Sequence, residues 1–385
     1  MARGRNRKNV EIDRRVLLIY AVLTALGVYL VASSSSFFAA AKFRDPYFLI
    51  KGHLVRVAVA VLALIIAMRV DYRLYRKPAV VGYIVAIGLL AGLFIAGETI
   101  RGTPKWYVFK SLHATLQPSE LARLALVIFL SAWITKKGKE IADLKRGFLP
   151  AAAAVLGVIG LMVAQPNFGT AAATALIALV LLYTGGARLR HLACFYGAMV
   201  VPVALKLWHE PYARERVLSF LKHGEKLQEA NWQIRQSLIG LGSGGFFGTG
   251  FGESRQKLNW LPDSHTDFIF SILGEEAGLI GTLLVSALFL LLVLRTMKMS
   301  QKCGDVFGEM MAIGFGSAIF IYAVLNMAVA TGLLPVTGLP LPFISFGGSA
   351  LVVNSFSIGI LCNISRRAGG SRQHARPHRV VRNTV

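Results

Sequence analysis

Three carboxylates gather where a polar stretch of the sequence runs into an apolar one. Asp267 ends the polar motif at residues 261–267, and Glu275 and Glu276 follow inside the apolar run. Ionisable groups at the end of a membrane span are costly unless they face protein, water or a ligand. Asp267 could serve as a general base, or it could cap the helix that follows. Glu275 and Glu276 lie roughly two and a half helical turns deeper, so we expect them to pack helices or to hold a cation in a cavity.

Two further pairs of charged residues could bind an anionic ligand. Glu120 and Arg123 are three residues apart, so they share one face of a helix. Arg123 falls inside a predicted span, where an internal ion pair with Glu120 and direct contact with an anionic substrate explain it equally well. Arg255 and Lys257 follow a glycine-rich run and could bind an anionic ligand or lipid head groups, with solvated surface charge as the alternative.

The glycine-rich run spans residues 240–252. Because glycine disfavours helix, we predict tight turns there, in or on the outer membrane interface, after an amphipathic helix at 232–241. The run lacks the Gly-Lys-Ser/Thr ending of a P-loop, which argues against a nucleotide site. No His/Cys cluster has transition-metal spacing, so Mg²⁺ or Mn²⁺ could bind only through carboxylates and a bound anionic substrate. His265, a lone histidine near a helix start, is expected to be a structural hydrogen-bonding residue.

The elements that would position these residues are membrane-spanning helices. Of the 385 residues, 55% are hydrophobic and only 16% are charged, and apolar runs of about 20 residues recur along the chain. The sequence therefore predicts an all-α polytopic membrane protein with about ten transmembrane helices and one large extracytoplasmic loop, at about 207–266. The expected spans are 16–38, 51–68, 78–97, 117–135, 148–164, 170–184, 191–207, 267–294, 309–331 and 346–365.

Most of the net charge of +23 lies in every second loop and in the two tails. Basic loops mark the cytoplasmic side of a membrane, so we expect both termini in the cytoplasm and no nucleic-acid partner. The domains are then a basic N-terminal tail at 1–15, a membrane domain at 16–365 and a basic C-terminal tail at 366–385. Basic residues of the inner loops include Arg69, Arg73, Arg76, Lys77, Lys136, Lys137, Lys139, Lys145, Arg146, Arg188, Arg190, Arg295, Lys298 and Lys302.

Several separated motifs resemble those of the SEDS family, the shape, elongation, division and sporulation proteins. The resemblance covers the whole chain except its basic tails, and the segments 253–257 and 332–343 resemble the division branch more than the elongation branch. Asn167 stands where the family usually has Asp, and the run 101–106 matches the family pattern only loosely. The matching motifs are Gln117-Pro-Ser-Glu120, Gln236-Ser-Leu-Ile239, Gly242-Ser-Gly-Gly245, Gly252-Glu-Ser-Arg-Gln-Lys257, His265-Thr-Asp-Phe-Ile-Phe270, Gly274-Glu-Glu276 and Gly338-Leu-Pro-Leu-Pro-Phe-Ile-Ser-Phe-Gly-Gly-Ser349.

The resemblance implies a peptidoglycan glycosyltransferase that polymerises lipid II, the undecaprenyl-pyrophosphoryl disaccharide pentapeptide, into glycan strands during septal cell-wall synthesis. It implies a class B penicillin-binding transpeptidase and other division proteins as partners, and a place in the bacterial plasma membrane at the division septum. It makes Asp267 the expected catalytic base. No cofactor is required by the sequence, although a divalent cation, Mg²⁺ or Mn²⁺, could take part.

The resemblance also bears on the other candidate site residues, which are Glu120, Arg123, Arg255 and Lys257. All four are expected to bind substrate, and Arg123 stands where the family more often has Lys. A lipid II flippase and a non-catalytic divisome scaffold remain as alternatives. Transport would place polar groups along the bilayer midplane, whereas these residues and Asp267 map to the outer side, which favours polymerisation.

Overall fold

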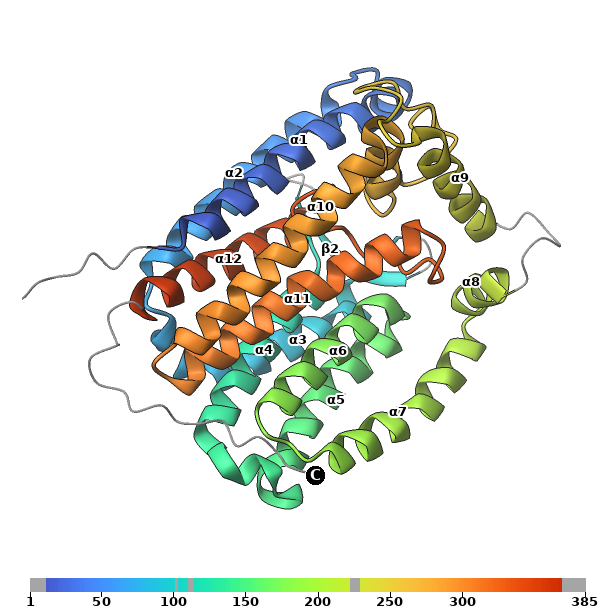
Figure 1. The fold of residues 1–385 in the computed structure, drawn as a ribbon. Helices are drawn as coiled ribbons and strands as arrows, with labels where there is room; N and C mark the ends of the chain where they lie inside the picture. The colour runs from blue at the N-terminus through green and yellow to red at the C-terminus, as the bar shows by residue number, and fades with distance from the viewer. Residues whose placement is uncertain (1–11, 101–102, 110–113, 222–228, 369–385) are drawn as a thin grey trace, which may run out of the picture.

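The computed structural model describes residues 12–100, 103–109, 114–221 and 229–368. Its main feature is a bundle of long apolar helices (Figure 1). Within the described residues, nine helices are long and apolar enough to cross a membrane, and the expected span at 170–184 corresponds to the shorter apolar helix α6. The bundle helices are α1 (Arg14–Phe43), α2 (Phe48–Arg69), α3 (Ala79–Ala96), α4 (Pro118–Lys137), α5 (Leu149–Ala164), α6 (Phe168–Thr184), α7 (Leu189–His209), α10 (Ile269–Lys302), α11 (Val306–Ala330) and α12 (Gly348–Ala368).

Local sequence signals set several helix boundaries. The Asp13 carboxylate accepts a hydrogen bond from the Arg15 backbone nitrogen at 3.0 Å and caps α1. Asp305 caps α11 in the same way, through the Gly308 nitrogen at 2.8 Å. Helix α4 begins with Pro118, which suits the first turn because its missing N–H has no helical partner. The basic tail residues 1–11 and 369–385 lie outside the described residues.

The most buried helices lie at the centre of the bundle. Helices α11 and α12 are surrounded by α4, α6, α10 and α2, and Phe315 and Tyr322 of α11 are almost wholly buried. Helix α7 stands at the edge, where Leu192 is the one buried residue along its 21 residues (Figure 1). An apolar helix with so little protein contact is expected to face lipid along most of its length.

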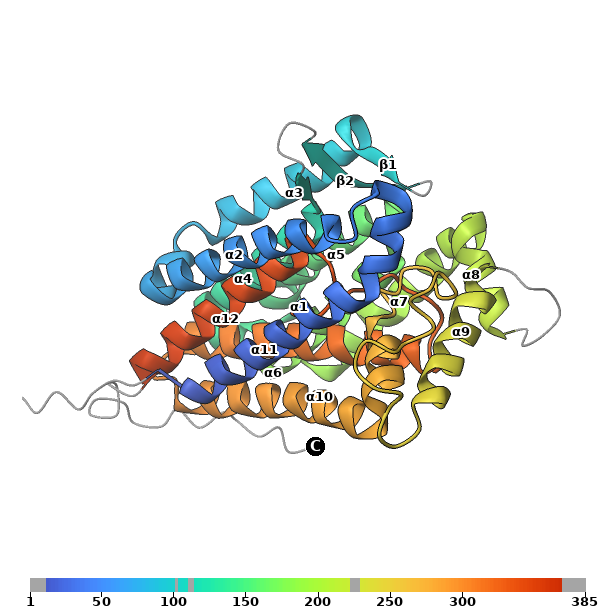
Figure 2. The same ribbon diagram turned by 90° about the horizontal axis from the view of Figure 1, so that it is seen from above.

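One end of the bundle carries most of the structure outside the spans (Figure 2). We call it the outer end, and it holds α8 (Pro211–Leu221), α9 (Glu229–Gly244) and a small antiparallel sheet. The sheet has the order β1-β2-β3, with β1 at Glu98–Ile100, β2 at Thr103–Phe109 and β3 at Ala114–Leu116. The Tyr107 hydroxyl of β2 donates to the Leu89 carbonyl oxygen of α3 at 3.0 Å, which fastens the sheet to the bundle. This sheet is an addition to the predicted helices.

The prediction that the whole glycine run 240–252 avoids helix is wrong for its first part. Helix α9 continues to Gly244, and turns begin after that residue. Packing stabilises this glycine-rich end, because the Ser237 hydroxyl contacts the Ser271 hydroxyl at 2.5 Å and donates to the Ala330 carbonyl oxygen at 2.6 Å. Tertiary contacts of this kind outweigh intrinsic helix propensity.

Candidate active site

Asp267 lies at the outer end of the bundle, two residues before α10 begins. A turn at Asp263, whose φ is +58°, directs the chain into the helix, and the Asp263 carbonyl oxygen accepts from the Thr266 and Asp267 nitrogens at 3.0 and 3.1 Å. The N-cap position of α10 falls on Phe268, whose side chain makes no capping hydrogen bond. The half-buried Asp267 is therefore not the N-cap residue that the capping interpretation expects.

The backbone around Asp267 is held by α11 and by the segment that leads into α12. Asn326 of α11 donates from Nδ2 to the carbonyl oxygens of Asp267 and Leu339, both at 2.8 Å. The Ser345 hydroxyl donates to the Thr266 carbonyl oxygen at 2.5 Å. A fixed backbone of this kind places the carboxylate of Asp267 with little freedom, as a catalytic group requires.

Two cations that sequence reasoning did not select share the electrostatic environment of Asp267. Lys105 comes from β2, and Arg216 comes from α8, where its Nη1 donates to the Val336 carbonyl oxygen at 3.0 Å. Burial, and after it repulsion by Arg216, lower the pKa of Lys105 to about 8, while the Asp267 carboxylate acts in the opposite direction. The structure thus brings one carboxylate and two cations together from three distant parts of the chain.

Sequence patterns gave only weak signals for these two cations. Lys105 belongs to the run 101–106, which matches the family pattern only loosely, and Arg216 belongs to a charged stretch that is typical of a surface helix. Only the fold shows that the charges of Arg216 and Asp267 both act on Lys105. A lysine with a lowered pKa next to a specific charged partner is a recognised mark of a functional site.

Glu120 and Arg123 form a buried ion pair inside the bundle. Arg123 Nη2 lies 2.6 Å from Glu120 Oε2, and the two side chains are 3% and 1% exposed. Arg123 also donates to Asn354 Oδ1 at 2.9 Å and stacks its guanidinium 4.4 Å from the centre of the Tyr322 ring. The Tyr322 hydroxyl donates to Glu120 Oε1 at 3.2 Å. Protein groups from α4, α11 and α12 therefore occupy most of this pair's polar atoms.

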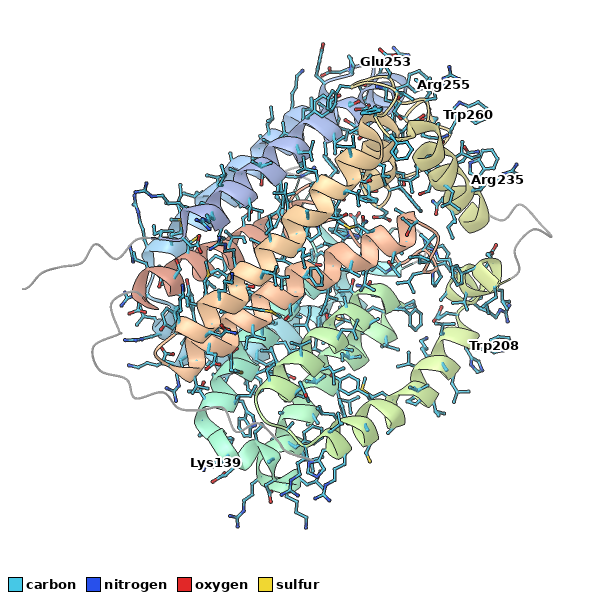
Figure 3. The ribbon with its side chains drawn as sticks, viewed as in Figure 1. Lys139, Trp208, Arg235, Glu253, Arg255 and Trp260 are labelled. Carbon is cyan, nitrogen blue, oxygen red and sulfur yellow. The ribbon has the colours of Figure 1, made fainter. Side chains whose placement is uncertain are left out.

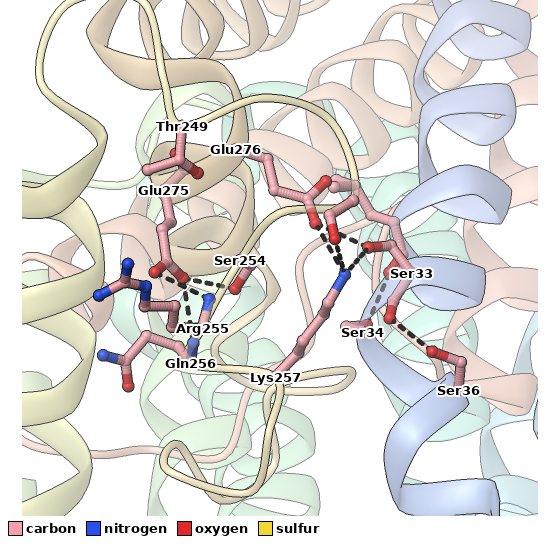
Figure 4. A network of polar contacts seen from close by, with 12 residues as sticks. Ser33, Ser34, Ser36, Thr249, Ser254, Arg255, Gln256, Lys257, Glu275 and Glu276 are labelled. Atoms are coloured by element: carbon pink, nitrogen blue, oxygen red, sulfur yellow. Dashed lines mark hydrogen bonds and ion pairs between the residues drawn. The ribbon is translucent and has the colours of Figure 1, made fainter.

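Lys257 joins a second network, which Figure 4 shows between the outer loop and α1. Its Nζ lies 3.7 Å from Glu276 Oε1 and donates to the Ser33 hydroxyl at 3.2 Å. Glu276 also accepts from the Tyr29 hydroxyl at 2.9 Å and from the Ser33 hydroxyl at 2.6 Å. Lys257 thus links the loop after the glycine run to helices α1 and α10.

The side chain of Arg255 is exposed, and Figure 3 shows it at the outer surface beside Glu253. Its backbone nitrogen instead donates to Glu275 Oε1 at 3.0 Å. Glu275 accepts two more hydrogen bonds through its other oxygen, from the Gln256 nitrogen at 3.2 Å and from the Ser254 hydroxyl (Figure 4). Glu275 is 2% exposed, so a buried carboxylate anchors the loop by its backbone.

The five residues selected from the sequence therefore occupy three separate places. Asp267 lies near Lys105 and Arg216, and the Glu120–Arg123 pair lies in the bundle. Arg255 and Lys257 belong to the loop that Glu275 and Glu276 hold. Among the described residues, no group of three or more His, Cys, Asp or Glu side chains is arranged to hold a metal ion.

Comparison with known proteins places most of the chain in one family. A family model described as cell cycle protein, covering FtsW, RodA and SpoVE, matches residues 13–369. A probable peptidoglycan glycosyltransferase FtsW of Trichlorobacter lovleyi is 38% identical over 92% of this chain and 93% of its own.

Solved structures agree with the sequence comparison. A chain from a peptidoglycan synthase complex, solved in a study of how polymerization and crosslinking are coordinated, superposes with a TM-score of 0.75 at 27% identity, over 93% of this chain and 98% of that one. The rod shape determining protein RodA of Thermus thermophilus superposes with a TM-score of 0.69 at 27% identity, over 92% of this chain and 97% of its own. The chain belongs to the FtsW/RodA/SpoVE family of cell cycle proteins, which is the SEDS family.

Proposed function

We propose that Asp267 is the general base with which this peptidoglycan glycosyltransferase polymerises lipid II into glycan strands. The observation that carries the proposal is Lys105 at the outer end of the bundle, on which the charges of Asp267 and Arg216 both act. The FtsW relatives at 38% identity are named as probable peptidoglycan glycosyltransferases. An acid–base group beside paired cations suits a sugar transfer whose leaving group is a pyrophosphate.

The chemistry requires one proton transfer and one displaced anion. The 4-hydroxyl of the acceptor sugar attacks the anomeric carbon of the donor, and its proton passes to the Asp267 carboxylate. A new glycosidic C–O bond forms while the bond from the anomeric carbon to the pyrophosphate oxygen breaks, and that oxygen keeps the electron pair. Lys105 and Arg216 stabilise the negative charge of the departing undecaprenyl pyrophosphate.

The distribution of charge favours polymerisation over a lipid II flippase. Asp267, Lys105 and Arg216 lie at the outer end, outside the spanning helices. The buried Glu120–Arg123 pair lies in the first turns of α4, and its partners are protein groups. A transport path would need polar groups near the bilayer midplane that remain available to a substrate.

We further propose a crosslinking partner and a septal site of action. A related chain was solved in a complex that coordinates polymerization and crosslinking, which supports a class B penicillin-binding transpeptidase as the partner. The FtsW names of the relatives support action at the division septum with other division proteins. The basic inner loops support a plasma-membrane topology with both termini in the cytoplasm.

The test is strand synthesis from lipid II by the purified protein, with and without its cognate transpeptidase. Asp267→Asn keeps the size of the side chain and removes the base, so we expect polymerisation to be abolished while the protein still folds and inserts. Asp263→Asn is the matched control, because it makes the same change on the same loop and Asn tolerates the positive φ. Near-normal synthesis by Asp267→Asn would remove Asp267 from the catalytic role.

A further inference from the structure

Helix α10 is broken inside an apolar span. Gly278 has φ of +66° and ψ of −165°, so the helix ends and restarts at this residue. A break frees backbone N–H and C=O groups, and such groups cannot be left unpaired within a membrane. The groups that pair with them come from the second half of the glycine run.

Residues 245–250 replace two helical hydrogen bonds across the break. In an unbroken helix the Leu279 and Ile280 nitrogens would donate to the Glu275 and Glu276 carbonyl oxygens. Here they donate to the carbonyl oxygens of residues 245 and 246, at 2.9 and 3.3 Å. The Glu275 and Glu276 oxygens accept instead from the nitrogens of residues 249 and 250, at 2.9 and 3.2 Å. The loop is therefore inserted into the helix.

Close packing fixes how deep the loop sits along α10. A Cβ atom at Gly248 would lie 2.1 Å from the Glu276 carbonyl oxygen, and one at Gly278 would lie 2.4 Å from the Gly248 nitrogen. Neither residue can carry a side chain without moving the backbone. The loop therefore holds one position relative to Leu279 and Ile280.

This position puts the backbone of Phe246 beside exposed apolar residues of α10. Phe246 and Phe247 are 70% and 83% exposed, and the Phe246 carbonyl oxygen bonds the Ile280 nitrogen. On α10 itself, Ile280 is 54% exposed, and Leu283 and Leu284 of the next turn are 59% and 61% exposed. The two phenylalanines thus continue an apolar surface that belongs to a membrane span.

We propose that Phe246 and Phe247 insert into the outer leaflet and contact the acyl chains of bulk phospholipids. The inserted pair and the break in α10 together anchor the outer loop in the membrane. The charged residues that follow, Glu253 and Arg255, lie at the outer surface (Figure 3), where water and head groups can solvate them. The loop therefore enters and leaves the apolar region within a few residues.

The test measures the environment of single spin labels in the full-length protein. Cys194, Cys303 and Cys362 are replaced, and one cysteine is introduced per variant before reconstitution into nanodiscs of phosphatidylethanolamine and phosphatidylglycerol without lipid II. Power saturation then compares collisions with oxygen, which concentrates in hydrocarbon, and with a water-soluble nickel chelate. Two further sites calibrate the scale: Leu284→Cys for hydrocarbon and Glu253→Cys for the aqueous surface.

We expect the label at Phe247→Cys to show an oxygen-to-nickel ratio several-fold above that at Glu253→Cys and close to that at Leu284→Cys. A ratio closer to the Glu253 site than to the Leu284 site would overturn the proposal. Phe246→Cys provides an independent second reading of the same surface. A melting temperature for each labelled variant establishes that the loop was measured in the folded protein.

Discussion

The lowered pKa of Lys105 makes the pH dependence of strand synthesis a sharp test of the active site. Lysine ordinarily has a pKa of 10.5, and burial with repulsion from Arg216 lowers it to about 8 in this fold. About half of the free enzyme then carries a charged Lys105 at pH 8, and about one tenth at pH 9. If the cation stabilises the departing pyrophosphate, kcat/KM should fall about tenfold for each pH unit well above 8.

The Lys105→Arg variant separates deprotonation of Lys105 from other causes of a fall in kcat/KM above pH 8. A guanidinium stays protonated across the accessible pH range, so this variant should keep a measurable kcat/KM that no longer falls between pH 8 and 9.5. Lys105→Ala should be slow at every pH. Lys51→Arg is the matched control, because Lys51 is exposed in the first turn of α2 and pairs with Asp45. This variant should reproduce the native pH profile.

Fold stability should respond to pH with the opposite sign. Because the pKa of Lys105 is lower in the folded state, the unfolded chain binds more protons between about pH 8 and 10.5. The free energy of unfolding should therefore rise over this window while activity falls. Initial rates of lipid II polymerisation and melting temperatures at matched pH values measure the two trends. A native profile that stays flat to pH 9.5, or a fall of equal size in Lys105→Arg, would refute the reasoning.

Three further outcomes are expected. Arg123→Ala should destabilise the protein by about 3–5 kcal/mol, because it leaves the buried Glu120 carboxylate unpaired, whereas Arg123→Lys should retain much of the stability and activity; an Ala variant with a normal melting temperature and normal kinetics would contradict this. Glu275→Ala should raise hydrogen exchange at 254–256 several-fold, since the carboxylate accepts two backbone N–H groups there, and unchanged exchange would show that other contacts hold the loop. Synthesis by Lys105→Ala should depend more on added Mg²⁺ or Mn²⁺ than native synthesis does, because a divalent cation can replace part of the lost charge, and equal losses on treatment with EDTA would speak against that role.

The spans were predictable because hydrophobic length alone specifies them. The Glu120–Arg123 contact was also predictable, since a spacing of three residues places two side chains on one helical face, and the structure gives a distance of 2.6 Å. The sequence could not show that the partners of this pair come from α11 and α12. Spacing along one helix carries no information about which other helix packs against it.

The site around Asp267 was predictable only in part. Its carboxylate stood out because it ends a polar motif directly before an apolar run. Lys105 and Arg216 did not, because charged loop residues are usually solvated and their approach depends on how β2 and α8 fold over the bundle. Lys257 is a different case, since its place after the glycine run predicted a bound ligand or solvent as its partner, while the structure pairs it with the carboxylate of the buried Glu276.

Sequence position predicted helix packing or a bound cation for Glu275 and Glu276, but it did not show which neighbour each carboxylate binds. Successive residues of a helix project about 100° apart, so the two carboxylates face different parts of the protein. Glu275 binds the backbone of the outer loop, and Glu276 binds α1 through Tyr29 and Ser33. One short stretch of α10 thus binds both the outer loop and α1. Its backbone also exchanges hydrogen bonds with the glycine run across the break at Gly278. Because this stretch of α10 is bonded at so many points, it can keep the preceding turn, and with it Asp267, in one place while a long lipid substrate moves past.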